Sequence, residues 1–492
     1  MQEVQGVALR DYQHQAVEML RSAFRRRVQR VLLVLPTGGG KTVIFAHIAQ
    51  QAALRGRRVG ILVHRNELMR QSSRALERLG VAHGRIAAGR GMALGHTVQV
   101  AAVQTLVRRL LQLPPDYFHL LIIDEAHHAT AGSWRKVLGH FPTARVLGVT
   151  ATPCRGDGQG LGVCFEEMVL GPSAAELTEQ GYLAPARVFI PPGPLDARHL
   201  RKRLGDYDMR EAQEELSGPR LLGDVVEHYQ HHLAGQTAIA FCCSVRHAEA
   251  IAEQFHQAGV TAASIDGRMD AVEREQLLQR LEVGELRVLT SCALIGEGID
   301  VPSVGGCILL RPTASLALHL QMIGRCLRPA AGKAQAIVLD HVGNVRRLGH
   351  HLDPIAWTLE GQAKRQQERG INIKLCPKCF CCMATQVRHC PACGVDVRLL
   401  EQQRKAAQQV GVEVVAGQLA ELSETERRLA QRARKTEQAQ AQGYDDLVEL
   451  GRQRGMKNPQ GWARHVMQAR GQKRSRFSQP AGARSAQREL VV

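Results

Sequence analysis

Long apolar runs are missing from this 492-residue chain. No segment approaches the ~20 consecutive apolar residues that a membrane-spanning helix needs. The N-terminal stretch MQEVQGVALRDYQ also lacks the basic and then apolar pattern of a secretory signal. We therefore predict a cytoplasmic protein that does not enter the membrane.

Acidic and aromatic residues are both scarce. The chain has 64 Lys and Arg against 46 Asp and Glu, a net charge of +18, and only 4% of its residues are aromatic. The basic balance favours a polyanionic partner, most often a nucleic acid. The shortage of aromatic side chains argues against base stacking as the main mode of binding.

Disulfides are not expected, although the chain has 13 cysteines, because a reducing compartment keeps thiols free. Six of them fall within residues 376–393, which indicates a metal site. Two C-x₂-C turns offer four thiolates that can close a tetrahedral Zn²⁺ shell, and an iron–sulphur cluster is the alternative. Nearby Cys381, Cys382 and His389 are interpreted as packing or solvent residues. The predicted zinc ligands are Cys376, Cys379, Cys390 and Cys393.

Short β-branched runs alternate with helical patterns in two successive parts of the chain. This alternation predicts an α/β fold with two parallel sheets, each covered by helices. The predicted strands lie at 31–35, 59–63, 98–102, 120–124 and 146–150, and then at 237–241, 261–265, 287–290, 306–310 and 336–340.

The predicted organisation has five parts. Residues 401–492 carry 17 Lys and Arg against 10 Asp and Glu, so the tail holds about +7 of the net charge. Within it, residues 444–470 are predicted to form a helical segment that docks either duplex DNA or a protein. The parts are a first α/β domain at 1–175, a linker with a short helix at 176–225, a second α/β domain at 226–350, a zinc-binding segment at 371–396, and a basic helical tail at 397–492 whose end is predicted to be disordered.

The stretch LPTGGGKT at 35–42 follows a predicted strand and precedes a predicted helix. In that context glycines let backbone amides wrap phosphates, and the N-terminus of the helix adds its positive dipole. Lys41 would then neutralise the terminal phosphates and Thr42 would ligate Mg²⁺. Leu35 stands where the usual GxxxxGK[ST] pattern has its first glycine.

An acidic pair completes the predicted nucleotide site. The segment LLIIDEAHH places Asp124 and Glu125 at the end of another predicted strand. Asp124 would hold Mg²⁺ through water, and Glu125 would orient and activate the attacking water.

Together these motifs resemble those of the superfamily 2 helicases and translocases. The remaining motifs of that family match in order over residues 8–345. The resemblance implies two tandem RecA-like P-loop domains that use ATP and Mg²⁺. The segment LRDYQ resembles the family's adenine-reading segment. The further residues that the resemblance assigns to ATP are Arg10, Gln13, Thr37, Gly38, Gly39, Gly40, Gly298 and Asp300.

The segment QMIGRCLRP at 321–329 fits the last motif of that series. By resemblance, Arg325 and Arg328 of the second domain stabilise charge on ATP bound to the first, Gln321 belongs to the same motif, and His127 links the ATP site to it. Other motifs of the series contact the nucleic acid in the family. They assign that role to His64, Arg65, Gln104, Thr105, Thr150, Thr152, Ser244 and Thr290.

A narrower resemblance concerns GVTATPCRGDGQGLG and the region around the last motif, which look like the RadD-type and prophage-type branch of the DEAD/DEAH helicases. That branch acts in DNA repair, recombination or phage DNA metabolism. Restriction-type helicase subunits are related, but no nuclease motif is found here. A strand-separating pin is not visible either, so translocation is more secure than unwinding.

Three functions are consistent with the sequence. A DNA helicase or translocase acting on single-stranded or branched DNA is favoured over an RNA helicase, because the motifs read DEAH and RDYQ rather than the strict DEAD-box pattern. An ATP-gated module that binds DNA without turnover is disfavoured, because Lys41, Glu125 and both arginines are present. A single-strand-binding or repair protein is the predicted protein partner.

Overall fold

The structure is a computed structural model, and contacts divide the chain into two units, 1–397 and 398–492. In the part that the structure describes, no helix has the length and apolar character to cross a membrane. The described residues are 8–154, 160–190, 200–203, 205–216, 219–292, 304–360, 373–376, 378–379, 381–385, 387–399, 412–415, 418–421, 441, 443–453, 458–461, 463–464 and 466–467.

Two sheets organise the first unit, and we call the regions around them the first lobe (8–179) and the second lobe (186–397). In the described part of the first lobe, seven strands form one parallel sheet in the order β3-β4-β2-β5-β6-β1-β7. Their bounds are β1 (Arg30–Val34), β2 (Val59–Val63), β3 (His83–Ile86), β4 (Val98–Ala102), β5 (Leu120–Asp124), β6 (Arg145–Thr150) and β7 (Glu167–Leu170).

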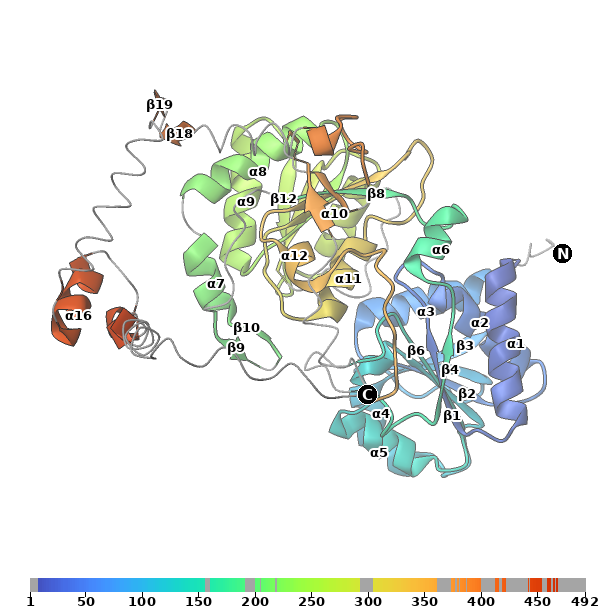
Figure 1. The fold of residues 1–492 in the computed structure, drawn as a ribbon. Coiled ribbons are helices and arrows are strands. Elements are labelled where there is room, and N and C mark those ends of the chain that lie inside the picture. The colour runs from blue at the N-terminus through green and yellow to red at the C-terminus, as the bar shows by residue number, and fades with distance from the viewer. Residues whose placement is uncertain are drawn as a thin grey trace, which may run out of the picture. The chain divides into compact units, whose positions relative to one another are not determined.

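Helices cover both faces of this sheet (Figure 1). Because each face is covered, every residue of β2 and β5 is buried, as their continuous apolar sequences predict. The helices are α1 (Asp11–Arg25), α2 (Lys41–Ala53), α3 (Asn66–Arg78), α4 (Val103–Arg109), α5 (Gly132–His140) and α6 (Ala174–Glu179), with 3₁₀ turns η1 (Leu110–Gln112) and η2 (Ala126–His128).

The second lobe has the same plan, but the strands at one side of its sheet are antiparallel. Its described strands follow the order β12-β13-β11-β14-β15-β8-β17-β16, parallel from β12 to β8 and antiparallel beyond. The strands are β8 (Ala186–Phe189), β11 (Ala238–Phe241), β12 (Ala262–Ile265), β13 (Val288–Ser291), β14 (Gly306–Leu309), β15 (Ala336–Asp340), β16 (Ile373–Leu375) and β17 (Cys381–Ala384). The helices are α7 (Met209–Leu216), α8 (Pro219–His232), α9 (Val245–Gln257), α10 (Ala271–Glu282), α11 (Leu316–Gly324) and α12 (Asn344–Leu348).

All ten predicted strands are present, and the two-sheet α/β prediction is confirmed. The expected linker at 176–225 needs correction, because β8 lies inside it and pairs with β15 in the second sheet. A short hairpin of β9 (Lys202–Arg203) and β10 (Asp206–Tyr207) also falls there. A four-residue strand such as ARVF is too short to stand out from a loop by periodicity.

The Cys-rich segment is not a separate piece either. Its strand β17 pairs with β8, and Cys376, Cys381 and Cys390 pack in one apolar cluster with Phe189 and Tyr229 of the second lobe. The second sheet supplies the apolar core for this segment, so a truncation before Cys376 would expose the second sheet at β8.

The tail, described by itself, is not purely helical as predicted. A short antiparallel hairpin joins β18 (Val412–Val415) to β19 (Gln418–Glu421). The helix α16 (Tyr444–Gln453) packs against the helical residues near 463–466 through Leu447, Val448, Ala463 and Val466. The predicted disordered end lies outside the described residues.

Direct contacts join the two lobes. One apolar cluster contains residues of both sheets, among them Leu33 and Leu309. Arg274 of α10 donates to Glu67 of α3 at 2.8 Å. The residues after α12 also return to the first lobe, where Gly162 N donates to Leu359 O at 2.8 Å. These contacts hold the carboxyl ends of the first sheet near the second lobe.

Candidate ATP site and its relatives

The glycine run forms the turn between β1 and α2. Gly38 and Gly40 have φ angles of 88° and 80°, which L side chains rarely adopt. A Cβ on Gly40 would also lie 2.4 Å from Nε2 of Gln13. Because Gly40 is the N-cap of α2, no side chain caps the first turn of that helix. The first turn therefore has the arrangement that binds phosphate through backbone amides.

Lys41 is the first residue of α2, followed by Thr42. Its Nζ donates to the carbonyl oxygen of Leu35 at 3.2 Å. Burial lowers the pKa of Lys41, whereas the nearby carboxylates of Glu125 and Asp124 oppose that shift. The guanidinium groups of Arg325 and Arg328 lower this pKa further. Charged residues of both lobes thus lie within electrostatic reach of one lysine.

The acidic pair lies at the carboxyl end of β5. Asp124 and Glu125 are 4% and 8% exposed, and Asp124 Oδ1 accepts from the Glu125 backbone amide at 3.0 Å. Glu125 has φ 52° and ψ 56°, a left-handed conformation that costs on the order of 1–3 kcal/mol for a residue other than glycine. Such strain is typical of functional sites. Here it turns the backbone away from the strand at the glutamate.

His127 joins this acidic pair to β6. Its Nδ1 lies 3.3 Å from Glu125 Oε2 and 3.3 Å from Thr150 Oγ1. The Thr150 hydroxyl donates to Thr152 O at 2.9 Å, so its one hydrogen is committed there. Nδ1 must therefore carry the proton and act as the donor to Thr150. The same N–H lies beside Glu125 Oε2 at ion-pair distance, without a hydrogen bond to that oxygen.

The arginine motif begins in α11 and ends in the turn after it. Gln321 is 4% exposed, and Arg325 is the 9% exposed C-cap of the helix. A Cβ on Gly324 would lie 2.5 Å from Thr37 Cβ, so the end of α11 packs directly on the glycine run. Burial lowers the pKa of Arg328 to about 10. Both arginines are thus held beside the nucleotide-binding turn of the other lobe.

Lys333 is a residue that the sequence interpretation missed. Its ammonium donates to the carbonyl oxygens of Val304 at 2.6 Å and Arg328 at 2.8 Å, and also to that of Cys326. Three bonds from one cation fix the backbone turn that carries Arg328. A lone lysine in PAAGKAQ gives no signal of this, because its acceptors are main-chain carbonyls.

The adenine-reading segment opens α1. Gln13 Oε1 accepts from Arg10 N at 3.0 Å, and the Tyr12 hydroxyl donates to Gly39 O at 3.0 Å. Tyr182 was also missed: its ring lies 4.6 Å from the Arg10 guanidinium and 5.1 Å from the Tyr12 ring. These contacts place an aromatic face beside Arg10 and Gln13. Gly298 and Asp300, also predicted to bind ATP, lie outside the described residues.

The predicted nucleic-acid residues divide by exposure. Three of the eight need correction as direct contacts, since their side chains are fully buried. Thr290 donates to Ala248 O at 2.7 Å. The others are exposed or half-buried, and His64 stacks edge-on against His128 with ring centroids 4.4 Å apart. The buried residues are Thr150, Thr152 and Thr290, and the accessible ones are His64, Arg65, Gln104, Thr105 and Ser244.

The four cysteines predicted to bind metal come together. Their sulphur atoms all lie within 4.8 Å of one another, with Cys376 and Cys393 3.6 Å apart and Cys379 and Cys390 3.5 Å apart. A tetrahedral shell with Zn–S bonds of ~2.3 Å requires sulphurs ~3.8 Å apart. The cluster therefore fits one zinc ion. Nearby Cys381 is buried on β17 and is not part of it.

Two family profiles match the chain. Residues 6–155 match "Type III restriction enzyme, res subunit", and residues 220–330 match "Helicase conserved C-terminal domain". A Lactococcus phage 51.5 kDa protein is 32% identical over 77% of this chain and 81% of its own length. The chain belongs to the superfamily 2 helicases.

Two further relatives bear on this helicase. The Saccharomyces cerevisiae protein IRC3, whose name proposes an ATP-dependent helicase, is 29% identical over 68% of this chain but only 51% of its own length. The "DNA 3'-5' translocase XPB2" of Sulfurisphaera tokodaii is 26% identical over 65% of this chain and 79% of its own length. As a superfamily 2 helicase, the chain is an ATP-hydrolysing enzyme, and enzymes of this family use ATP with Mg²⁺.

Proposed function

We propose that this helicase is a DNA-dependent ATPase that moves along single-stranded or branched DNA in repair, recombination or phage DNA metabolism. The observation that carries the proposal is that Lys41, Asp124 and Glu125 of the first lobe lie within electrostatic reach of Arg325 and Arg328 of the second. Opening and closing of the two lobes with ATP turnover would move a strand bound across both. A relative named as a DNA translocase supports DNA over RNA.

The proposed chemistry assigns one task to each group. Lys41 and the backbone of the glycine run would hold the terminal phosphates, Thr42 would ligate Mg²⁺, and Asp124 would hold that ion through water. Glu125 orients the attacking water, with His127 holding its carboxylate. Arg325 and Arg328 neutralise charge that develops on the phosphoryl group. The adenine would lie against Arg10, Gln13 and Tyr182.

Domain roles follow from these assignments. We propose that residues 1–175 form the ATP-binding domain and that the helicase C-terminal domain extends beyond 226–350 to include β8 and the Cys-rich strands. The four cysteines would hold structural zinc, because the cluster is compact enough for one ion and four thiolates complete a tetrahedral shell. The Cys-rich strands would extend the second sheet and lead into the basic tail.

A protein partner and a cellular compartment complete the proposal. A single-strand-binding or repair protein is the proposed partner, and the RadD-type and prophage-type branch is the proposed subfamily. The cytoplasm is the proposed compartment, in keeping with 13 free thiols and no cystine.

ATP turnover measured with different polynucleotides tests the proposal. We expect Mg²⁺-dependent hydrolysis that single-stranded or forked DNA stimulates strongly and RNA stimulates little. Lys41→Ala should abolish the signal by removing nucleotide binding. Stimulation by RNA alone would replace the DNA assignment with an RNA helicase. A fork with a labelled strand, followed in the same reactions, would separate unwinding from translocation alone.

A further inference from the structure

A second hollow lies in the first lobe, away from the ATP site. It has a volume of about 580 Å³ and lies between the ends of α1 and α2 and the starts of β2, β5 and β6. Asp124 lies at the carboxyl end of strand β5, and His119 precedes the amino end of the same strand. Five residues of strand span roughly 17 Å. The hollow is therefore separated from the ATP site by the length of the strands.

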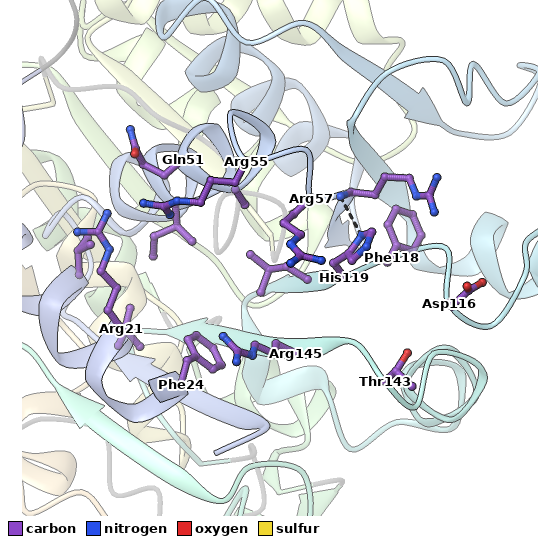
Figure 2. Close-up of a pocket in the computed structure, with 16 residues that line it drawn as sticks. Arg21, Phe24, Gln51, Arg55, Arg57, Asp116, Phe118, His119, Thr143 and Arg145 are labelled. Atoms are coloured by element: carbon purple, nitrogen blue, oxygen red, sulfur yellow. Dashed lines mark hydrogen bonds between the residues drawn. The ribbon is translucent and has the colours of Figure 1, made fainter. Parts of the chain in front are cut away.

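The floor of the hollow is apolar. Leu20 of α1 and Ile48 of α2 line it together with Phe118 and Leu120. Phe24 adds an aromatic face, and the Arg145 guanidinium lies 5.6 Å from the centre of that ring. Figure 2 shows Phe24 and Arg145 side by side at this end of the hollow. Such a floor accepts an apolar side chain, whereas the polar edges of a base would lose their hydrogen bonds there.

The rim of the hollow is strongly basic. Arginines reach around it from several elements, whereas Asp116 is the one acidic residue among those that line it (Figure 2). Arg58 is held by a 2.7 Å bond to Tyr117 O, and Arg21 pairs with Glu18. In the part of the chain that the structure describes, Arg55 and Arg57 are exposed and have no ion-pair partner. The five rim arginines are Arg21, Arg55, Arg57, Arg58 and Arg145.

The floor of the hollow decides which ligand suits this rim. α1 and α2 both point their C-terminal ends toward the hollow, so they present carbonyl oxygens rather than the amides that often hold phosphate. The positive charge comes instead from arginine side chains, whose forked guanidinium groups bind carboxylate and phosphate alike. Beneath them lies the apolar floor. Carboxylates that flank an apolar anchor match both the arginines and the floor.

We propose that this hollow is a docking site for an acidic peptide segment of a partner protein, with an aromatic or aliphatic side chain in the apolar floor and carboxylates on Arg55 and Arg57. The argument rests on charge complementarity and goes beyond the proposed motor function. Because the hollow lies at the amino ends of the strands and the ATP site at their carboxyl ends, docking leaves the ATP motifs accessible. A partner can then be carried while the motor turns over.

Binding of a short fluorescein-labelled peptide, in which glutamates flank a central Phe-Leu pair, tests the proposal by anisotropy with the full chain. We expect saturable binding that weakens about tenfold or more in Arg55→Glu/Arg57→Glu. Arg90→Glu/Arg280→Glu is the matched control, because it changes the net charge equally at exposed arginines outside the hollow. That control should bind the peptide as the parent chain does. Basal ATP hydrolysis should be unchanged in both variants, which verifies folding.

Two altered probes sharpen the result. Replacing Phe-Leu by Ser-Ser should remove most of the binding, and replacing the glutamates by glutamines should do the same. Equal binding of the Ser-Ser peptide would overturn the docking site in favour of a plain basic surface. Displacement of the peptide by single-stranded DNA, with the same dependence on Arg55 and Arg57, would instead assign the hollow to nucleic acid. Neither outcome bears on whether the motor hydrolyses ATP.

Discussion

The two lobes have similar parallel sheets but differ in how the helix after a comparable strand is capped. In the first lobe, β1 leads through glycines to α2, whose N-cap Gly40 has no side chain to satisfy the first amides. In the second lobe, β11 leads through two cysteines to α9, where the Ser244 hydroxyl accepts from His247 N at 3.1 Å. A helix that is capped by its own side chain offers less to phosphate.

The charges follow the same division. The open helix end of the first lobe is accompanied by the carboxylates Asp124 and Glu125, which suit Mg²⁺ and water. The second lobe contributes the cations Arg325 and Arg328 to the same place. In the proposed function, one fold would thus serve two tasks, with the first lobe binding the nucleotide and the second completing the charge around it. Substitutions should separate binding from turnover along this boundary.

The largest expected effect comes from the arginines of the second lobe. Arg325→Ala and Arg328→Ala should each lower ATP turnover by ~10³–10⁵, as the loss of an arginine finger does in related NTPases. ATP binding, followed with a fluorescent analogue, should change little because the first lobe is intact. An equal loss of binding and turnover would mean that the second lobe helps to hold the nucleotide, which would break the comparison.

A smaller loss of ATP turnover is expected when Glu125 of the first lobe is substituted. Glu125→Gln keeps the size and hydrogen-bonding reach of the side chain but removes the base, so turnover should fall by ~10²–10⁴. Stopped-flow measurement should show ATP binding retained and a longer-lived DNA complex. Wild-type hydrolysis by this variant would exclude Glu125 as the group that activates water. Glu77→Gln is the matched control, because this exposed residue of α3 pairs with Arg85 within the same lobe.

Loss of metal should act on the second lobe alone. Replacing any one of the four cysteines by serine should release one Zn²⁺ per chain and destabilise the second sheet, because β17 pairs with β8 and structural zinc supplies folding energy. Calorimetry should show an earlier transition for the second lobe and an unchanged one for the first. Cys164→Ser, at a buried cysteine of the first lobe that lies outside the cluster, controls for the substitution itself. Finding iron or no metal in the purified protein would contradict the zinc assignment.

Lys333→Met should slow turnover by a smaller factor, of about tenfold, since it leaves Arg328 present but loosens the turn that carries it. The Michaelis constant should change less than kcat, because the lysine holds a backbone of the second lobe and not the nucleotide. Lys333→Arg should recover part of the loss by donating to some of the same carbonyls. A change confined to thermal stability would assign Lys333 a purely structural role.

The smallest effect is expected at the cap of α9. Ser244→Ala removes the acceptor for His247 N and should lower the stability of the second lobe by ~1 kcal/mol. Denaturant unfolding measures this difference. Nucleotide binding should stay in the first lobe, because the freed amides lack the glycine turn. A new nucleotide site in the second lobe would show that the cap alone accounts for the difference in nucleotide binding between the lobes.

Local sequence was enough to predict the strands and the motifs. Apolar runs such as LLIID and VGILV predict buried strands because both faces of a parallel sheet are covered, and their burial bears this out. The glycine run likewise needs only its neighbours, since positive φ angles at Gly38 and Gly40 depend on the missing Cβ. Strands β8 and β17 were missed, because such short strands owe their pairing to partners far away in the chain.

By itself, the sequence determined the two-sheet plan, the family motifs and the cysteine pattern, since each depends on residue types at fixed spacing. Only the tertiary structure decided what lies between distant segments. It placed Lys333 under the Arg328 turn, Tyr182 beside Arg10, and the Cys-rich strands on the edge of the second sheet. It also gathered the rim arginines of the hollow, Arg55 and Arg145 among them, from α1, from the turn between α2 and β2, and from β6. Through-space contacts between residues far apart in the chain leave no periodicity in the sequence, so no local pattern could reveal them.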